Sequence, residues 1–436
     1  MRLLLVTLLG LAAGGAAAED AARLEALEER VNYLEDELAR TRAEWHAADI
    51  APDDSWTDRV SLSGSAEIGH YGGQSDAVTH DAGYRVWDAR LFLDAELGED
   101  IRVGSQPLVR NLGLTAEWNL VRLGDLVNEV GELYLDLQGI GGSPWLNFRP
   151  GRFQAPVGEA YPRYGRDAGK DPFISAPLGG PWWWDEGVMV YGGSEEGLAG
   201  YVASISNGET AFGYDAGSGE QVTLKLWTQP LPWLYVSASA LSSGEIEGSG
   251  GALWLGESWA TPIGDETDVE TFFDGAPQAD ADGGYARTWL AGGDVVLTPH
   301  EALRIWLAYG QYQIDGDDGS AYDRTLHYGI AELVLRGSVL GPQFAPGYVG
   351  FRADTLGTFD DGRGFLLDWR YAETLGYNME EYWAYTLVAG WELGRHAVLR
   401  IEYSFRDIDL VEGVPDEVRD EAEDPSTFAV EFGVHF

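Results

Sequence analysis

The sequence predicts an all-β fold: a transmembrane antiparallel β-barrel of about 16 strands, preceded by a short N-terminal coiled-coil helix. The first observation behind this is the stretch from Thr427 to Phe436, in which apolar side chains alternate without a break with small or polar ones. The second is that runs of this period recur from Arg59 onward. The third is that long and short gaps take turns between the runs, as expected when long loops lie at one rim of a barrel and tight turns at the other.

The first segment, residues 1–18, is predicted to be a secretory signal peptide. Met1-Arg2 is followed by an apolar run and then by Ala16-Ala17-Ala18, which favours cleavage near Ala18 and export of the remainder. No later segment has the roughly 18 unbroken apolar residues of a transmembrane helix. The sequence contains no cysteine, so neither disulfides nor thiolate metal sites are expected.

Residues 19–46 are predicted to form a short periplasmic coiled coil, and residues 47–58 a linker. The apolar seam, with alternating spacings of three and four residues, consists of Leu24, Leu27, Val31, Leu34 and Leu38. The flanking charges pair with opposite sign in a parallel oligomer, and a helix this short needs partners to persist in water. We therefore expect a homotrimer. A single amphipathic helix resting on another surface is the alternative.

The barrel is expected to occupy residues 59–436. Its expected strands are 59–71, 84–97, 112–121, 129–138, 144–153, 187–193, 198–206, 220–228, 233–242, 284–298, 301–314, 324–337, 347–355, 382–393, 397–406 and 426–436. The expected outer loops are 72–83, 122–128, 154–186, 207–219, 243–283, 315–323, 356–381 and 407–425. Two gaps on the tight-turn side, 98–111 and 338–346, are longer than the pattern requires, which leaves a misplaced boundary or a bulge open there.

The chain is strongly acidic, with 72 acidic and 28 basic residues and a formal net charge of −44. Such a chain repels nucleic acid, which excludes DNA or RNA as a partner. Loops 243–284 and 407–425 carry much of the excess. We expect them to form an acidic outer rim that attracts cations or binds divalent ions between lipopolysaccharide head groups, with plain solvated loops as the alternative. The expected partners of the barrel surface are outer-membrane lipids and lipopolysaccharide.

Parity along each strand sorts the charged residues between lipid and lumen. If Trp87, Leu91 and Leu93 face lipid, the charged residues that alternate with them face inward. The lumen-facing charges predicted in this way are Asp88, Arg90, Arg149, Lys225, Arg304, Arg352, Arg400, Arg406 and Glu431. The inner wall is therefore expected to carry both signs of charge.

The plan of signal peptide, short coiled coil and barrel resembles the phosphate-selective porin O and P family. Short sequence motifs are similar too: Pro150-Gly151-Arg152-Phe153-Gln154-Ala155-Pro156-Val157-Gly158-Glu159, Ile205-Ser206-Asn207-Gly208 and the terminal Phe436. The resemblance implies a trimer of water-filled barrels in the outer membrane of a Gram-negative bacterium, through which small hydrophilic solutes and ions diffuse.

The third long gap, 154–186, is rich in proline, glycine and aromatic residues and is nearly neutral in an acidic chain. General porins fold their third outer loop inward to narrow the channel, and we expect the same here. The residues predicted at this pore constriction are Glu159, Arg163, Arg166, Asp167, Lys170 and Asp171. An ordinary surface loop is the alternative.

Phosphate selectivity in that family rests on inward arginines and clusters of lysine. This sequence has only two lysines, Lys170 and Lys225, and about as many inward acids as bases. A mixed channel with a transverse field, or one that prefers cations, therefore fits the charge count better. An anion or phosphate channel remains the alternative, because Arg163, Arg166 and Lys170 could form a local anion site.

Two further classes of function are weighed against a channel. The sequence has no Gly-x-Ser-x-Gly or His-Glu-x-x-His motif, and its seven histidines are scattered. We therefore expect no enzyme, no cofactor and no metal site, with a lipid hydrolase of unrecognised residues as the enzymatic alternative. A structural tether between the membrane and the cell wall is the other. Permeation that depends on solute size would distinguish a porin from both.

Overall fold

The computed structural model divides into two units, Met1–Arg59 and Val60–Phe436, and describes mainly the second. The described ranges are 59–73, 83–122, 125–159, 172–175, 177, 184–208, 220–243, 246–247, 253–255, 258–262, 285–316, 324–359, 365–369, 372–411 and 426–436. The predicted signal peptide, coiled coil and linker lie outside the described residues. So do five of the predicted constriction residues, Arg163, Arg166, Asp167, Lys170 and Asp171.

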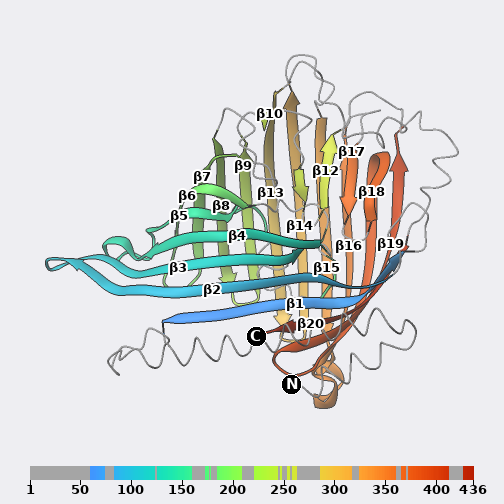
Figure 1. Cartoon of the computed structure of the whole chain (residues 1–436), viewed down its shortest axis with the longest axis horizontal. Coiled ribbons are helices and arrows are strands. Elements are labelled where there is room, and N and C mark those ends of the chain that lie inside the picture. The colour runs from blue at the N-terminus through green and yellow to red at the C-terminus, as the bar shows by residue number, and fades with distance from the viewer. Residues whose placement is uncertain are drawn as a thin grey trace. The chain divides into compact units, whose positions relative to one another are not determined.

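One antiparallel sheet of 20 strands forms the second unit. Sixteen of these strands follow one another around a ring: β1(Val60–Gly73), β2(Gly83–Val103), β3(Gln106–Arg122), β4(Asp125–Gln138), β5(Asn147–Gln154), β6(Trp184–Gly193), β7(Ala199–Ser206), β8(Gln221–Leu231), β9(Leu234–Ser242), β13(Tyr285–His300), β14(Leu303–Gly316), β15(Arg324–Arg336), β16(Gly347–Thr358), β18(Ala372–Glu392), β19(Ala397–Leu410) and β20(Ser426–His435). The four short strands that extend it are β10(Ile246–Glu247), β11(Leu253–Leu255), β12(Ser258–Pro262) and β17(Phe365–Trp369). The ring is closed, because β1 pairs with β2 on one side and with β20 on the other (Figure 1). The predicted barrel is confirmed.

The last residue completes the closure of this ring. The main chains of Gly64 and Phe436 exchange two hydrogen bonds, with N to O distances of 3.1 and 3.0 Å. The phenyl ring of Phe436 lies against Gly64, where a Cβ would come within 2.8 Å of its Cζ atom. A glycine is therefore required at position 64 to let the terminal ring cover the first strand.

Side chains along the strands alternate between an exposed apolar face and a buried polar one. On β19, the outward residues Leu399, Ile401, Tyr403 and Phe405 are 40–46% exposed. The residues between them, Arg400, Glu402, Ser404 and Arg406, are at most 2% exposed. This is the pattern of a transmembrane barrel, whose apolar side chains meet lipid while its polar ones face the interior.

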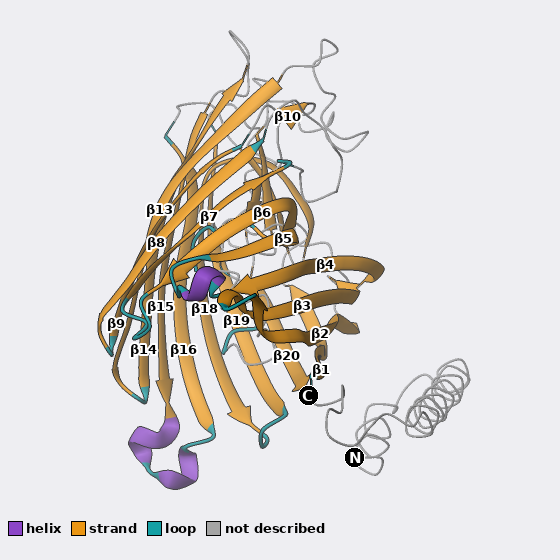
Figure 2. Ribbon diagram, turned by 90° about the vertical axis from the view of Figure 1, so that its left-hand side faces the viewer, coloured by secondary structure: helices purple, strands orange, loops and turns teal. Residues whose placement is uncertain are grey.

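The two rims differ in the length of their connections. On one rim, the two residues Gly104-Ser105 connect β2 to β3. On the other rim, a longer segment connects β14 to β15. Two connections on the tight-turn rim are longer. The β4–β5 connection holds a short 3-10 helix, Ile140–Gly142. The β15–β16 connection holds two, Gly337–Leu340 and Pro342–Phe344, seen at the lower end of Figure 2. Short turns face the periplasm in barrels of this kind. The chain termini of the ring, at β1 and β20, lie on the same rim as these turns.

Three predicted strand boundaries are wrong. The segment 98–111, expected to be a connection, is almost entirely strand, because β2 continues to Val103 and β3 begins at Gln106. This part of β2 lies beyond Ala95, the last residue of β2 that pairs with β1. The long loop expected at 122–128 is reduced to two residues, since β3 and β4 pair as far as Arg122 and Asp125. In place of a loop at 356–381, β18 begins at Ala372 and pairs with β17. In all three places the strands extend beyond the apolar band, where composition no longer distinguishes strand from loop.

The orientation predicted for Trp87 is also wrong. Glu67 pairs with Asp88 but the next residue, Ile68, pairs with Val86, so a bulge leaves Trp87 without a partner on β1. The indole is 1% exposed and packs on Tyr71 at 5.0 Å between ring centroids. One extra residue in a strand reverses parity locally, which a count of alternating positions cannot detect.

No helix among the described residues is long and apolar enough to cross a membrane.

Candidate functional site: the barrel interior and its inner loop

The first described part of loop 154–186 lies against the inner faces of β8 and β9. The main-chain N–H of Gly158 donates to Ser239 Oγ at 3.0 Å, and the Gly158 carbonyl accepts from Lys225 Nζ at 2.6 Å. Lys225 also forms an ion pair with Glu159 at 2.7 Å, and the Tyr235 hydroxyl donates to the same carboxylate at 2.5 Å. Both Lys225 and Glu159 are more than nine-tenths buried. Glu159, the one described constriction residue, is thus held by the wall rather than left free to face a passing solute.

The second described part, residues 172–175, lies against β16 and β19. Glu402 accepts the main-chain N–H groups of Ile174 and Ser175, at 2.7 and 3.1 Å. Arg400 Nη1 donates to the carbonyl of Phe173 at 3.0 Å. These bonds join residues more than 220 positions apart in the sequence.

Further contacts fix the same segment to β16. Arg352 donates to the Ser175 carbonyl at 2.8 Å and to its Oγ at 2.7 Å, and its guanidinium lies 4.7 Å from the ring centroid of Phe173. The Tyr348 hydroxyl donates to the carbonyl of Pro172 at 3.1 Å. In the ring, β13, β14 and β15 lie between β9 and β16. Loop 154–186 therefore contacts two separate sectors of the inner wall.

The wall recognises mostly the main chain of residues 172–175. Five of the six groups it binds are backbone N–H or C=O groups, and only Ser175 contributes a side-chain oxygen. Buried backbone groups need partners wherever they are removed from water. The inward arginines and Glu402 supply them here, as a neighbouring strand would in a sheet.

The cations that hold this segment are neutralised by buried acids. Arg400 forms ion pairs with Glu67, at 2.9 Å, and with Glu431. Glu431 also accepts from the Tyr71 hydroxyl at 2.7 Å. Arg352 pairs with Asp354 at 3.0 Å, and both side chains are 0% exposed. Removing one partner of such a buried pair leaves an uncompensated charge, which is far more costly than losing the pair.

A second group of buried charges lies on β2 and β3. Arg90 and Asp88, both 4% exposed, form an ion pair at 2.7 Å. Arg90 also approaches Glu117 at 3.8 Å, and Glu117 accepts from the indole N–H of Trp184 at 3.2 Å. Trp184 begins β6, so this contact fixes the returning end of the inner loop.

Arginines are the more accessible members of two further inward pairs. Arg149 is 22% exposed and pairs at 3.0 Å with Asp136, which is 12% exposed. Arg304 is 29% exposed and pairs at 2.7 Å with Glu332, which is 1% exposed. The guanidinium of Arg149 is stacked on Tyr134, 4.0 Å from the ring centroid. Each pair therefore presents its cation to the interior more than its acid.

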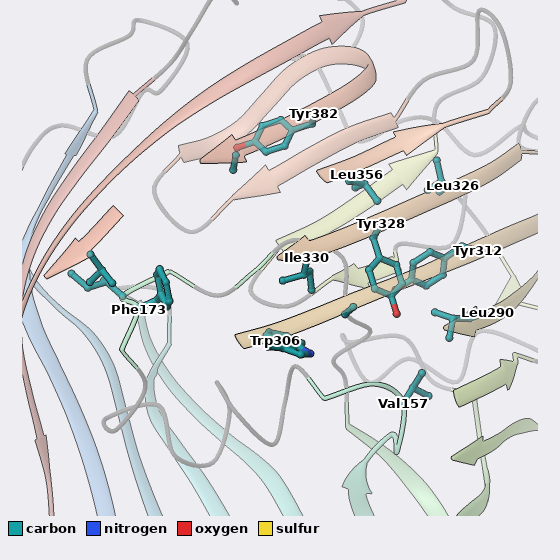
Figure 3. Packing of buried hydrophobic residues seen from close by; sticks show 14 of the residues in the cluster. Val157, Phe173, Leu290, Trp306, Tyr312, Leu326, Tyr328, Ile330, Leu356 and Tyr382 are labelled. Atoms are coloured by element: carbon teal, nitrogen blue, oxygen red, sulfur yellow. The ribbon is translucent and has the colours of Figure 1, made fainter. Parts of the chain in front are cut away.

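An apolar sector completes the inner wall, on β13, β14 and β15. Its buried side chains are Leu290, Trp306, Tyr312, Leu326, Tyr328 and Ile330 (Figure 3). Figure 3 places Val157 of the inner loop on the same side of the interior as Leu290, and Phe173 farther along. Tyr328 lies across Gly310 and Gly292, where an added Cβ would come within 2.3 and 2.6 Å of the phenol. The ring is thus flat against the sheet.

The predicted lumen charges fall into two groups by exposure. The nearly buried ones, at most 7% exposed, are Asp88, Arg90, Lys225, Arg352, Arg400, Arg406 and Glu431, whereas Arg149 and Arg304 are partly exposed. Sequence reasoning missed Glu67 and Asp354, which share parity with Ser65 and Arg352 and could have been found from it. It also missed Tyr348, for which no signal existed, whereas Phe173 is one of the aromatic residues that already distinguished loop 154–186. Among the described residues, no cluster of three or more possible metal ligands occurs.

Comparisons with known proteins support the fold. No family model and no curated protein matches the sequence. Among solved structures, in-vitro folded OmpT, an outer-membrane protein of Vibrio cholerae, covers 86% of this chain and 97% of its own, with 12% identity and a TM-score of 0.53. An anion-selective porin from Comamonas acidovorans covers 86% and 99%, with 12% identity and a TM-score of 0.53. OprB of Pseudomonas putida covers 87% and 95%, with 11% identity and a TM-score of 0.50.

Proposed function

We propose that this porin-like transmembrane barrel is an outer-membrane porin, a channel for passive diffusion of small hydrophilic solutes and ions. The observation that carries the proposal is the inner loop. A closed barrel with lipid-facing apolar side chains has a polar interior, and the segment at 172–175 is held inside it, on the inner wall, by Arg352, Arg400 and Glu402. A loop fixed there narrows the passage, and loop 154–186 with the inward charges sets its selectivity.

Conductance in planar bilayers tests this proposal. The purified barrel is expected to give discrete channels, and liposomes that contain it are expected to swell at rates that fall with the size of the sugar supplied. Deleting residues 160–180 is expected to raise the single-channel conductance, because the constriction is removed. Unchanged conductance would make the loop an ordinary surface loop, and size-independent swelling would favour a tether or an enzyme.

Location and assembly follow as parts of the same proposal. A cleaved signal peptide, short periplasmic turns and a lipid-facing apolar band suit the outer membrane of a Gram-negative bacterium. A homotrimer is suggested by the predicted coiled coil, and one solved form of the Vibrio cholerae protein is described as a trimer. Cross-linking of native detergent extracts tests it, since monomers alone would contradict it.

Anion selectivity is the second candidate, and a specific observation favours it. Arg149 and Arg304 are more exposed to the interior than the acids that pair with them. The Comamonas acidovorans porin of similar fold is described as anion-selective. The acidic composition of the whole chain argues for cations instead. The sign of the reversal potential across a salt gradient decides between the two.

A further inference from the structure

A cavity of about 690 Å³ opens at the tight-turn rim, apart from the contacts of the inner loop. Its lining includes the rings of Tyr191 on β6, Tyr201 on β7 and Trp227 on β8. Its charged groups are Arg110 on β3 and Glu195 in the β6–β7 turn. Tyr191, Trp227, Arg110 and Glu195 are the four residues considered for binding. A volume of this size is typical of small-molecule sites, which combine apolar surface with a few polar groups that fix orientation. None of these four residues forms a hydrogen bond or ion pair with the described residues of loop 154–186.

Trp227 forms a flat floor for this cavity. A Cβ on Gly200 would lie 2.5 Å from the indole Cζ2 atom, and one on Gly193 would lie 3.3 Å from it. The indole therefore lies across two glycines of neighbouring strands, with one ring face on the backbone. The ring of Tyr235 stacks beside the indole, 6.1 Å away between centroids and with the two ring planes 21° apart. Trp227 is partly exposed and lines the cavity, so part of the indole is accessible from it.

The charged groups of the cavity can form hydrogen bonds beyond those they make in the structure. Within the described part of the chain, Arg110 makes one long hydrogen bond, 3.3 Å to the Gly142 carbonyl. Glu195 makes no hydrogen bond or ion pair with any other described residue. The hydroxyl of Tyr191, by contrast, is already used by Asp136 at 2.6 Å. The cavity thus offers an aromatic face, a donor of up to four further hydrogen bonds and a carboxylate acceptor.

This combination selects one class of solute. An inorganic ion would be attracted by one of the two charged groups and repelled by the other. A plain aromatic ring would cover Trp227 but leave both charged groups without partners. A sugar ring has a C–H face that packs on an indole and a rim of hydroxyls, each of which can donate to Glu195 and accept from Arg110.

We propose that this cavity is a binding site for a monosaccharide at the periplasmic mouth of the channel, a proposal that rests on the proposed porin function. The site is distinct from the loop constriction, so a sugar bound there would interrupt the ion current without any movement of residues 172–175. Its occupancy would be set by Trp227 and by hydrogen bonds to Arg110 and Glu195.

Ion current through single channels, measured while D-glucose is added on the tight-turn side, tests the site. Glucose is expected to reduce the wild-type current in a saturable manner. Trp227→Ala is expected to weaken this block about tenfold, the upper end for loss of one ring contact. Trp227→Phe, which keeps a ring, is expected to retain most of it. The matched control is Trp289→Ala, because Trp289 is 53% exposed on the lipid-facing side, and its block is expected to equal that of the wild type.

The outcomes separate this inference from the function on which it rests. A barrel that does not conduct at all would overturn the porin proposal itself. A conducting wild type that glucose does not block, or a Trp227→Ala channel blocked as strongly as the wild type, would overturn the sugar site alone. Equal block by glycerol at the same osmolarity, or stronger block by phenol, would do the same. Glu195→Gln and Arg110→Gln should each weaken the glucose block while leaving the current without sugar almost unchanged.

Discussion

Two sectors of the inner wall are held together by different kinds of interaction. On β16, β19, β20 and β1, buried arginines and acids bind the backbone of residues 172–175 through directed hydrogen bonds. On β13, β14 and β15, apolar and aromatic side chains form a packed surface instead. The charged sector can hold one geometry only, whereas the apolar sector tolerates small changes of shape. The difference teaches that charges inside a barrel can serve to position a loop and need not face the solute.

The largest effect should come from removing a cation of the charged sector. Arg400→Met leaves Glu67 and Glu431 buried without their guanidinium partner, which should reduce the free energy of unfolding by about 3–5 kcal/mol. The loop also loses a bond at Phe173, so the single-channel current should become noisier. Urea unfolding in detergent and bilayer recordings measure the two effects. A stable, quiet Arg400→Met channel would show that the charged sector does not hold the loop.

Gly390→Ala tests whether the charged sector depends on rings lying flat against the sheet. A Cβ at position 390 would lie 2.1 Å from Cζ of Tyr348, so the phenol would have to leave its place and its bond to Pro172. Overpacking of this kind costs about 1–3 kcal/mol. Thermal unfolding should show the loss. Gly394→Ala is a poor control because of its positive φ, so Gly113→Ala, with no atom closer than 3.6 Å, serves instead.

A conservative truncation in the apolar sector should do less. Ile330→Val removes one buried methylene and should lower the free energy of unfolding by about 0.5–1.5 kcal/mol. Ile330 is 4% exposed and contacts no charged group of the loop in the described part of the chain, so reversal potential and current noise should stay as in the wild type. A change of ion selectivity in this variant would contradict the division between the two sectors.

The smallest effect is expected from an exposed ion pair at the rim. Arg336 and Glu392 lie 2.8 Å apart, but their side chains are 45% and 43% exposed. Solvent screens such pairs, so Arg336→Gln should change the free energy of unfolding by no more than about 1 kcal/mol. The same urea titration used for Arg400→Met measures it. A loss comparable with that of Arg400→Met would mean that burial is not what makes the inner pairs valuable.

The sequence allowed most of the barrel to be predicted, because alternation of period two survives in nearly every strand. Parity placed Arg352, Arg400 and Glu431 on the inner side of their strands, and it failed at Trp87, where a bulge adds a residue. The apolar sector also left a visible signal that was not used. Around Trp306 and Tyr328, both faces of β14 and β15 are apolar, which a strand with one water-facing side would not show.

The contacts of the inner loop could not be predicted in the same way. Arg352 and Ser175 are 177 residues apart, and Arg400 binds the carbonyl of Phe173, an atom that every residue possesses. Recognition of a backbone leaves no characteristic side chain at the recognised position. The packing of the Tyr348 ring flat on Gly390 could not be predicted either, since a glycine can occur in a strand for several different structural reasons.

The pairing of Gly64 with Phe436 has a consequence for how this protein is made. The two residues that close the cylinder are far apart in the sequence, so the seam cannot form until the segment that contains Phe436 has been synthesised and exported. A truncated chain that ends before Ser426 lacks β20 and leaves the edges of β1 and β19 unpaired. Each unpaired edge is a template for pairing with other chains. Such fragments are expected to aggregate during export, and chaperones that shield unpaired edges would be needed until β20 is available to pair.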